Sequence, residues 1–245
     1  MEYSNEIVEQ KPRYSALSRV FNVLWEPAEV FKDIKIKPSW ILPWILLSVI
    51  SILSAQVSWK YIVEHQIDQL RDRPGMTEEQ FERVQEQMGD SEGWSTNRIM
   101  AIVFTPIGII IAMLVVAGVL YLTGSVIGGG NANFKENLGV YSHAAVVGIV
   151  GAIVNTVLVQ ARGAFDISLS PELFMPLSME DTFIYGFLSH FEFFAIWTFV
   201  LTSIGFSEIY KFSRTKSYIS VGILWLIWIV ISEVFSNMFG GMFGV

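Results

Sequence analysis

Five long apolar stretches dominate the pattern of hydrophobic and polar positions along this chain. A helix needs about 20 mostly apolar residues to cross the hydrocarbon core of a bilayer, and each stretch comes close to that length. The pattern therefore predicts an all-α fold, a polytopic transmembrane helical bundle with five spans. The expected spans cover residues 40–59, 99–124, 141–159, 184–205 and 218–239.

The segment before the first span, residues 1–39, is amphipathic. Apolar residues recur at helical spacing on both sides of Pro27, and basic residues stand between them. This pattern is typical of short helices that lie in the membrane interface with cations near anionic headgroups. The alternative is an arm folded onto the loop after the fourth span. In the interfacial interpretation the anchoring residues are Phe21, Leu24, Phe31, Lys35 and Lys37.

The loop at residues 60–98 is long, acidic and helical by pattern. The first span is expected to continue past the membrane as a helix as far as Pro74-Gly75. A second helix then begins with Thr77 as its N-cap and Gln80 at the capping-box position. A further short helix is expected after Ser170-Pro171, within the loop that follows the third span.

Composition supports the membrane class and excludes several others. Hydrophobic residues make up 52% of the 245 residues and charged residues 16%, well below the quarter usual in soluble domains. The net charge of −7 is no signature of nucleic-acid binding. The chain has no cysteine, which excludes disulfides, thiolate metal sites and cysteine nucleophiles.

The distribution of lysine and arginine predicts the orientation. Ten of these residues fall before the first span and in the loops after the second and fourth, against six in the other loops. The N-terminus is therefore expected in the cytoplasm and the C-terminus outside.

Each expected span carries a polar group in its outer half. Ionisable residues inside spans are costly and usually face the bundle or water. The set predicts either a polar cavity that opens outward or a group of hydrogen bonds that joins the helices. Its members are Glu192, Glu233, Asn155, Thr105 and Gln56.

Small residues repeat every four positions in the third span, at Ala144, Gly148 and Ala152. Such spacing lets helices approach closely in lipid. It fits packing within the chain, which we favour, and also a homo-oligomer interface.

No catalytic or cofactor motif is present. The sequence lacks H-E-x-x-H, G-x-S-x-G and a P-loop, and the three glycines at 128–130 fit a turn. His190 and Glu192 are two residues apart, which places them on different faces of a helix. We therefore expect no enzyme activity, no metal, no cofactor and no evident small-molecule substrate. The expected partners are the lipid bilayer and a membrane protein or a second copy of the chain.

Three segments together resemble the Yip1 domain family in its bacterial form. They are "WEPAEVF" (Trp25–Phe31), "GGGNANFKENLGVYSHAA" (Gly128–Ala145) and "WTFVLTSIGFSEIYKFSRTKSYISVGILW" (Trp197–Trp225). The positions that match the family are Pro27 and Phe31, then Phe134, Tyr141 and Ser142, then Trp197, Gly205, Ser213 and Lys216.

The resemblance implies a five-span protein of the bacterial cytoplasmic membrane with no enzymatic site. Eukaryotic members interact with Rab GTPases, but their "DLYGP" motif is missing here, so Rab binding does not carry over. The resemblance favours a membrane adaptor or scaffold in membrane organisation, trafficking or export. The alternatives are a transporter, a channel or an accessory subunit of an export complex that uses the outer-half cavity, and an intramembrane enzyme that uses His190 and Glu192.

The orientation can be tested with alkaline phosphatase, which needs an oxidising compartment for its disulfides. A fusion after Val245 is expected to be active, and a fusion after Lys216 inactive. The reverse pattern would overturn the orientation and the outer-half placement of the polar groups.

Overall fold

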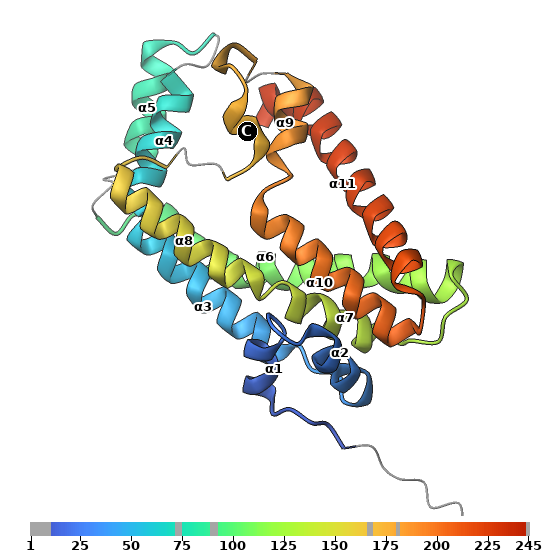
Figure 1. The fold of residues 1–245 in the computed structure, drawn as a ribbon. Coiled ribbons are helices and arrows are strands. Elements are labelled where there is room, and N and C mark those ends of the chain that lie inside the picture. Colours follow the sequence, from blue (N-terminus) through green and yellow to red (C-terminus); the bar gives the residue numbers. More distant parts are fainter. Residues whose placement is uncertain (1–10, 72–74, 89–92, 166–168, 180–181, 244–245) are drawn as a thin grey trace, which may run out of the picture.

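The computed structural model describes residues 11–71, 75–88, 93–165, 169–179 and 182–243. Within these ranges the chain is built from helices without any strand, so the all-α prediction is confirmed (Figure 1). The α-helices are α1 (Ala16–Asn22), α2 (Pro27–Ile36), α3 (Ile41–Val57), α4 (Trp59–Arg71), α5 (Glu78–Met88), α6 (Thr96–Tyr121), α7 (Phe134–Ala144), α8 (Val147–Arg162), α9 (Phe183–Ser189), α10 (Phe193–Tyr210) and α11 (Arg214–Phe243).

Four helical segments of the described chain are long and apolar enough to cross a membrane. They are residues 96–127, 134–162, 193–210 and 214–236. A fifth span results if α3 and α4, which meet at a 69° bend, count as one. The five expected spans are consistent with this arrangement.

The third and fourth spans begin at residues other than those expected. The third starts at Phe134 because Asn133 and Glu136 form a capping box there. A short turn follows Ala144, where α7 ends, and α8 then continues the span. The fourth starts at Phe193 because the chain leaves the helix between α9 and α10, with Glu192 as N-cap of α10.

The loop at residues 60–98 is helical, as expected, with α4 and α5 in its described part. The capping box at the start of α5 is present: Thr77 N donates to Gln80 Oε1 at 3.1 Å and Gln80 N donates to Thr77 Oγ1 at 3.3 Å. A 3₁₀ turn, η2 (Pro171–Phe174), follows Ser170 where a short helix was expected.

The connecting segments gather at two ends of the bundle. In Figure 1, α1 and α2 lie at one end, and α4, α5 and α9 lie at the other. The turns that follow the second and fourth spans lie together, because Lys216 Nζ donates to the Gly128 carbonyl at 3.4 Å. Lys35 of α2 donates to the Ile209 carbonyl at the end of α10, which places α2 at the same end. The segment before the first span and the turns after the second and fourth spans, which together carry most of the lysines and arginines, thus lie at the same end of the bundle.

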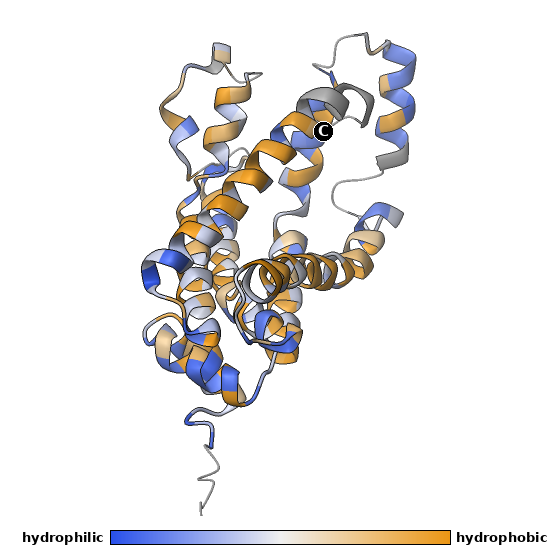
Figure 2. Cartoon of the chain, turned by 90° about the vertical axis from the view of Figure 1, so that its right-hand side faces the viewer, coloured by the Kyte–Doolittle hydropathy of each residue, from blue (hydrophilic) through white to orange (hydrophobic). Residues whose placement is uncertain are grey.

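Between these ends the outer faces of the bundle are apolar. In the apolar middle of the second span only 6% of the residues are buried. The fifth span, in α11, is hydrophobic for most of its length, as the orange colour in Figure 2 shows. The exposed residues of α3 form a row at every fourth position: Ile41, Ile45, Val49, Leu53 and Val57. An apolar surface of this extent fits contact with lipid rather than water.

The largest core cluster lies where α2, α7 and α10 meet. Phe31 and Val140 are fully buried there. A Cβ at Gly205 would collide with the Val140 side chain and lie 3.0 Å from the Phe31 ring. Glycine at position 205 therefore permits the close approach of these three helices.

Replacing Gly205 with alanine is expected to lower the thermal stability of the purified protein. Overpacking costs about 1–3 kcal/mol, which exceeds the gain of roughly 1 kcal/mol in helix propensity. Gly222→Ala is the matched control, because its new Cβ would lie 3.7 Å from Phe199, an ordinary contact. Equal melting temperatures of the two variants in a gel-filtration stability assay would contradict the close packing.

Candidate functional site

The candidate site is the end of the bundle that carries α1 and α2, which we call the N-terminal platform (residues 11–39). The sequence builds it from local signals. Ser15 caps α1 by accepting a hydrogen bond from Ser18 N at 3.2 Å. Pro27 opens α2 at its first position, where a missing N–H costs nothing. The two short helices are thereby set off from each other by a turn.

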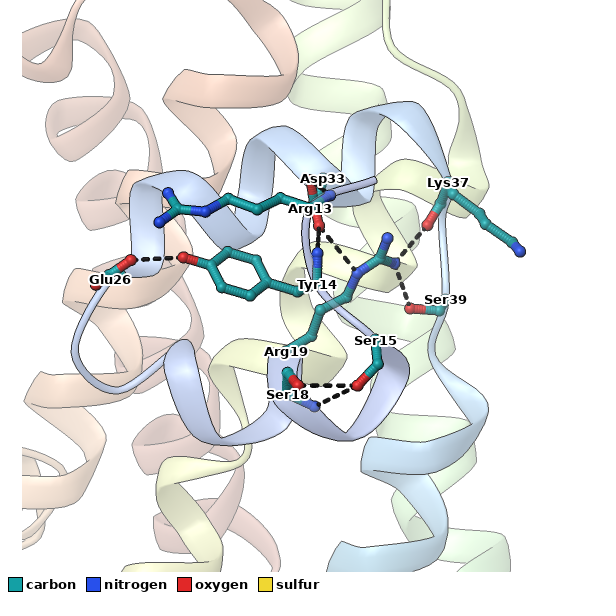
Figure 3. A network of polar contacts seen from close by, with 9 residues as sticks. All are labelled: Arg13, Tyr14, Ser15, Ser18, Arg19, Glu26, Asp33, Lys37 and Ser39. Atoms are coloured by element: carbon teal, nitrogen blue, oxygen red, sulfur yellow. Dashed lines mark hydrogen bonds and ion pairs between the residues drawn. The ribbon is translucent and has the colours of Figure 1, made fainter. Parts of the chain in front are cut away.

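A buried ion pair joins these helices. Arg19 of α1 and Asp33 of α2 lie 3.6 Å apart (Nε to Oδ2), and their side chains are 3% and 6% exposed (Figure 3). Both groups have further partners. The backbone N–H groups of Arg13 and Tyr14 donate to the carboxylate at 2.8 and 2.6 Å.

The guanidinium reaches the segment that leads into the first span. Arg19 Nη1 donates to the Lys37 carbonyl at 2.7 Å and to Ser39 Oγ at 3.1 Å. Burial lowers the pKa of Arg19 while the charge of Asp33 raises it, and an arginine remains charged in proteins. One buried pair thus joins residues 13 and 14, both helices and the entry to α3.

A second set of contacts lies on the solvent side of the platform. Tyr14 donates from its hydroxyl to Glu26 at 2.5 Å, and this hydrogen bond raises the pKa of Tyr14. Lys32 donates to Glu29 at 2.6 Å, which lowers the pKa of Glu29 and raises that of Lys32. Each of these exposed pairs adds little stability, because water screens the attraction.

The buried face of α2 corrects part of the interfacial prediction. Phe31 is fully buried against α7 and α10, so the expectation that it anchors the chain in lipid is wrong. The side chain of Lys35 donates a hydrogen bond to the Ile209 carbonyl at the end of α10, as described above. Phe21 and Lys37 are exposed and Leu24 is half-buried, so their role as anchors stays a prediction.

The glycine-rich turn is shaped by an aromatic ring from α10. A Cβ at Gly124 or Gly130 would collide with the Tyr210 ring. The Tyr210 hydroxyl lies 3.0 Å from Ser125 Oγ and accepts a hydrogen bond from Asn137 Nδ2 at 2.8 Å. Gly130, in the segment where the sequence predicts a turn, therefore makes room for the Tyr210 ring.

The five polar residues of the spans make contacts in several directions. Gln56 Oε1 accepts from Arg98 Nε at 2.6 Å, and Thr105 donates to the Ala101 carbonyl of its own helix at 2.7 Å. Asn155 is half-buried on α8, and Glu192 caps the start of α10 without a side-chain cap bond. An outer-half cavity that joins all five stays a prediction.

Glu233 has a partner that sequence reasoning missed. His190 Nε2 lies 2.9 Å from Glu233 Oε1 and 3.2 Å from Ser232 Oγ. A Cβ at Gly186 would collide with the Glu233 carboxylate, so α9 and α11 approach closely at this point. A helical pattern that runs unbroken from residue 184 hides this contact, because it gives no sign that the helix stops at His190.

The three small residues of the third span differ in burial, and the choice between packing within the chain and a homo-oligomer interface stays a prediction. Ala144 is fully buried in the core at the end of α7. A Cβ at Gly148 would lie 3.5 Å from Leu47 of α3, while Ala152 is half-buried on α8. The turn after Ala144 interrupts the predicted stripe. Gly151, which the stripe omitted, makes the closer approach, 3.1 Å from a new Cβ to the Phe194 ring.

One pocket of about 190 Å³ lies at the other end of the bundle, between α4 and the residues that follow α8. Its lining is Tyr61, Glu64, His65, Asp68, Gly163, Ala164 and Phe165. None of the five polar span residues lines it. Among the described residues no group of three or more metal-binding side chains is arranged to hold an ion.

The three segments that carry the resemblance meet at the platform and the adjoining turns. Phe31 packs on Gly205, and Ser213 Oγ accepts from the backbone N–H of Lys216 at 3.2 Å. A profile of the Yip1 domain matches residues 21–235. The chain belongs to the Yip1 domain family. The match begins within α1 and ends within α11, so α2 and all the spans are part of the Yip1 domain.

The chain is also similar to a named bacterial protein. It is 25% identical over 232 residues to the membrane protein YknW of Bacillus subtilis (strain 168), and the alignment covers 92% of each chain. No solved structure matches the chain. Yip1 family membership and the apolar helices together identify an integral membrane protein.

Replacing Arg19 with alanine is expected to release the platform from the bundle. Removal of one member of a buried ion pair costs about 3–5 kcal/mol, because the other charge stays buried. Hydrogen exchange of α1 and α2 should rise strongly in the variant while the spans stay protected.

Arg13→Ala is the matched control for this variant. The Arg13 side chain is 63% exposed and its Nη1 lies 3.9 Å from Glu29, so its loss should cost less than about 1 kcal/mol. If the amide hydrogens of α1 and α2 exchange at the same rate in the two variants, the buried pair does not hold the platform.

Proposed function

We propose that this Yip1 protein is a non-enzymatic membrane adaptor or scaffold in membrane organisation, trafficking or export. Its place is the bacterial cytoplasmic membrane, with the platform in the cytoplasm and the C-terminus outside. The observation that carries the proposal is the buried Arg19–Asp33 pair. A surface fixed in this way loses little conformational entropy when a partner binds, which favours binding.

The outer face of the platform suits a protein partner. Arg13, Glu29 and Lys32 stand close together on it, and Lys37 is exposed near the entry to α3. Mixed charges at a rim give specificity and orientation more than affinity. The basic residues of the turn after the fourth span extend this surface, with Arg214 paired to Glu208 at 2.7 Å.

A second candidate function rests on the other end of the bundle. There the chain leaves the helix between α9 and α10, just before the fourth span, and His190 meets Glu233 of the fifth span beside this break. Interrupted helices and ionisable residues within spans are common at the substrate sites of transporters. This observation favours a transporter, a channel or an accessory subunit of a membrane export complex.

A lysine-reactive cross-linker applied to intact cells tests the adaptor role. We expect Lys32 and Lys37 to form cross-links to one partner protein, identified by mass spectrometry after purification. Lys60, on α4 at the other end and also exposed, is the internal control and should not reach the same partner. Arg19→Ala should remove the cross-links to the partner, and Gly222→Ala, on α11 outside the platform, should keep them.

Two results would contradict the adaptor proposal. One is the absence of intermolecular cross-links from the platform at native expression. The other is a partner that Arg19→Ala retains, since such a partner would bind elsewhere. A partner that is itself an export transporter would favour the accessory-subunit role.

A further inference from the structure

Three large apolar side chains form an exposed row along α1 and the turn after it. Leu17, Phe21 and Trp25 recur at every fourth position and are 54%, 61% and 78% exposed. Trp25 stays in line with the helix because its backbone N–H donates to the Asn22 carbonyl at 3.1 Å. Isolated exposed apolar residues are common, but a row of three, two of them aromatic, marks a surface that contacts another apolar phase.

The opposite face of α1 fixes the direction of this row. Val20 is 3% exposed and Val23 is fully buried, and Arg19, one turn before Val23, is paired with Asp33. Rotating the helix to hide Phe21 would expose these valines and break the buried ion pair. The row therefore faces outward as long as the platform is folded.

We propose that this row inserts into the interfacial layer of the bilayer beside α3, and that the platform thereby lies on an anionic membrane surface. The first argument is continuity. α1 packs against α3, whose exposed row from Ile41 onward belongs to a candidate span. Ile36, exposed at the end of α2, lies in the chain between the two rows.

The second argument is charge and side-chain chemistry. Residues 11–39 carry six lysines and arginines against three carboxylates, although the whole chain has a net charge of −7. Basic segments next to a span are attracted to anionic headgroups. Tryptophan is enriched at the level of the headgroups, where its ring is apolar and its N–H is polar. The inference concerns lipid contact and does not depend on the adaptor role.

The absence of cysteine makes the chain suited to single-site spin labels. Phe21→Cys and Trp25→Cys place a label on the row, and Ala16→Cys places one on an exposed position off it. None of these side chains is buried, so the platform should fold in all three variants. Each full-length variant is reconstituted in nanodiscs that hold one copy, with either a phosphatidylglycerol-containing or a purely zwitterionic bilayer.

Collision rates with oxygen and with a water-soluble nickel chelate give the depth of each label. We expect labels at positions 21 and 25 to be exposed to oxygen and shielded from nickel at least several-fold relative to position 16. The shielding should be greater in the anionic bilayer. Water-like values at all three positions would overturn the proposal.

A second copy or a partner protein is the other possible occupant of the row. If labels 21 and 25 become shielded only in discs that hold two copies, with spin–spin broadening between them, the row is an interface between copies and the lipid proposal fails. Shielding in single-copy discs supports lipid, because neither a second copy nor a partner protein is present. This outcome leaves the cross-linking test of the adaptor role unaffected.

Discussion

The burial of one charge pair at the end of the bundle is the constraint on which the platform depends. Arg19 and Asp33 are removed from water, and a buried charge is tolerated only if it is paired and hydrogen-bonded. The partners that meet this requirement come from residues 13–14 and from Lys37 and Ser39. The chain on both sides of the two helices is therefore fixed by the same pair. Loss of either charge leaves the other unsatisfied, which makes this part of the structure cooperative.

The spans were predictable from sequence because lipid demands about 20 apolar residues in a row, whatever the rest of the fold does. The capping box of Thr77 and Gln80 was also predictable, because both side chains bond backbone groups at the start of their own helix. The break between α9 and α10 could not be predicted from the sequence. Residues 183–194 are apolar apart from Ser189, His190, Glu192 and the hydroxyl of Tyr185, and they contain no proline. Hydropathy therefore extends a helix through the break, whose geometry depends on the contact with Glu233.

The orientation of α2 shows a different limit. An amphipathic stripe predicts which residues turn away from water, but lipid and protein core are equally apolar destinations. Phe31 belongs to such a stripe and lies in the protein core, while Phe21 belongs to the neighbouring stripe and is 61% exposed. What separates them is the pairing of Arg19 with Asp33, two residues 14 positions apart. Periodicity within one helix carries no information on that pairing, so the candidate site could be predicted only in outline.

The two kinds of packing in this molecule support each other. Within lipid, helices gain nothing from the hydrophobic effect and associate through close contact at small residues, as at Gly151 and Phe194. At the platform, next to water, burying Phe31 and Ile34 is favourable by about 1.5–3 kcal/mol for each side chain. Ile34 packs beside Gly139 of α7, and Phe31 packs beside Gly205 of α10. A core of the kind found in soluble proteins thus holds together two membrane helices that lipid alone would leave weakly associated, and the charge pair that orients α2 determines that its apolar face is the one that does so.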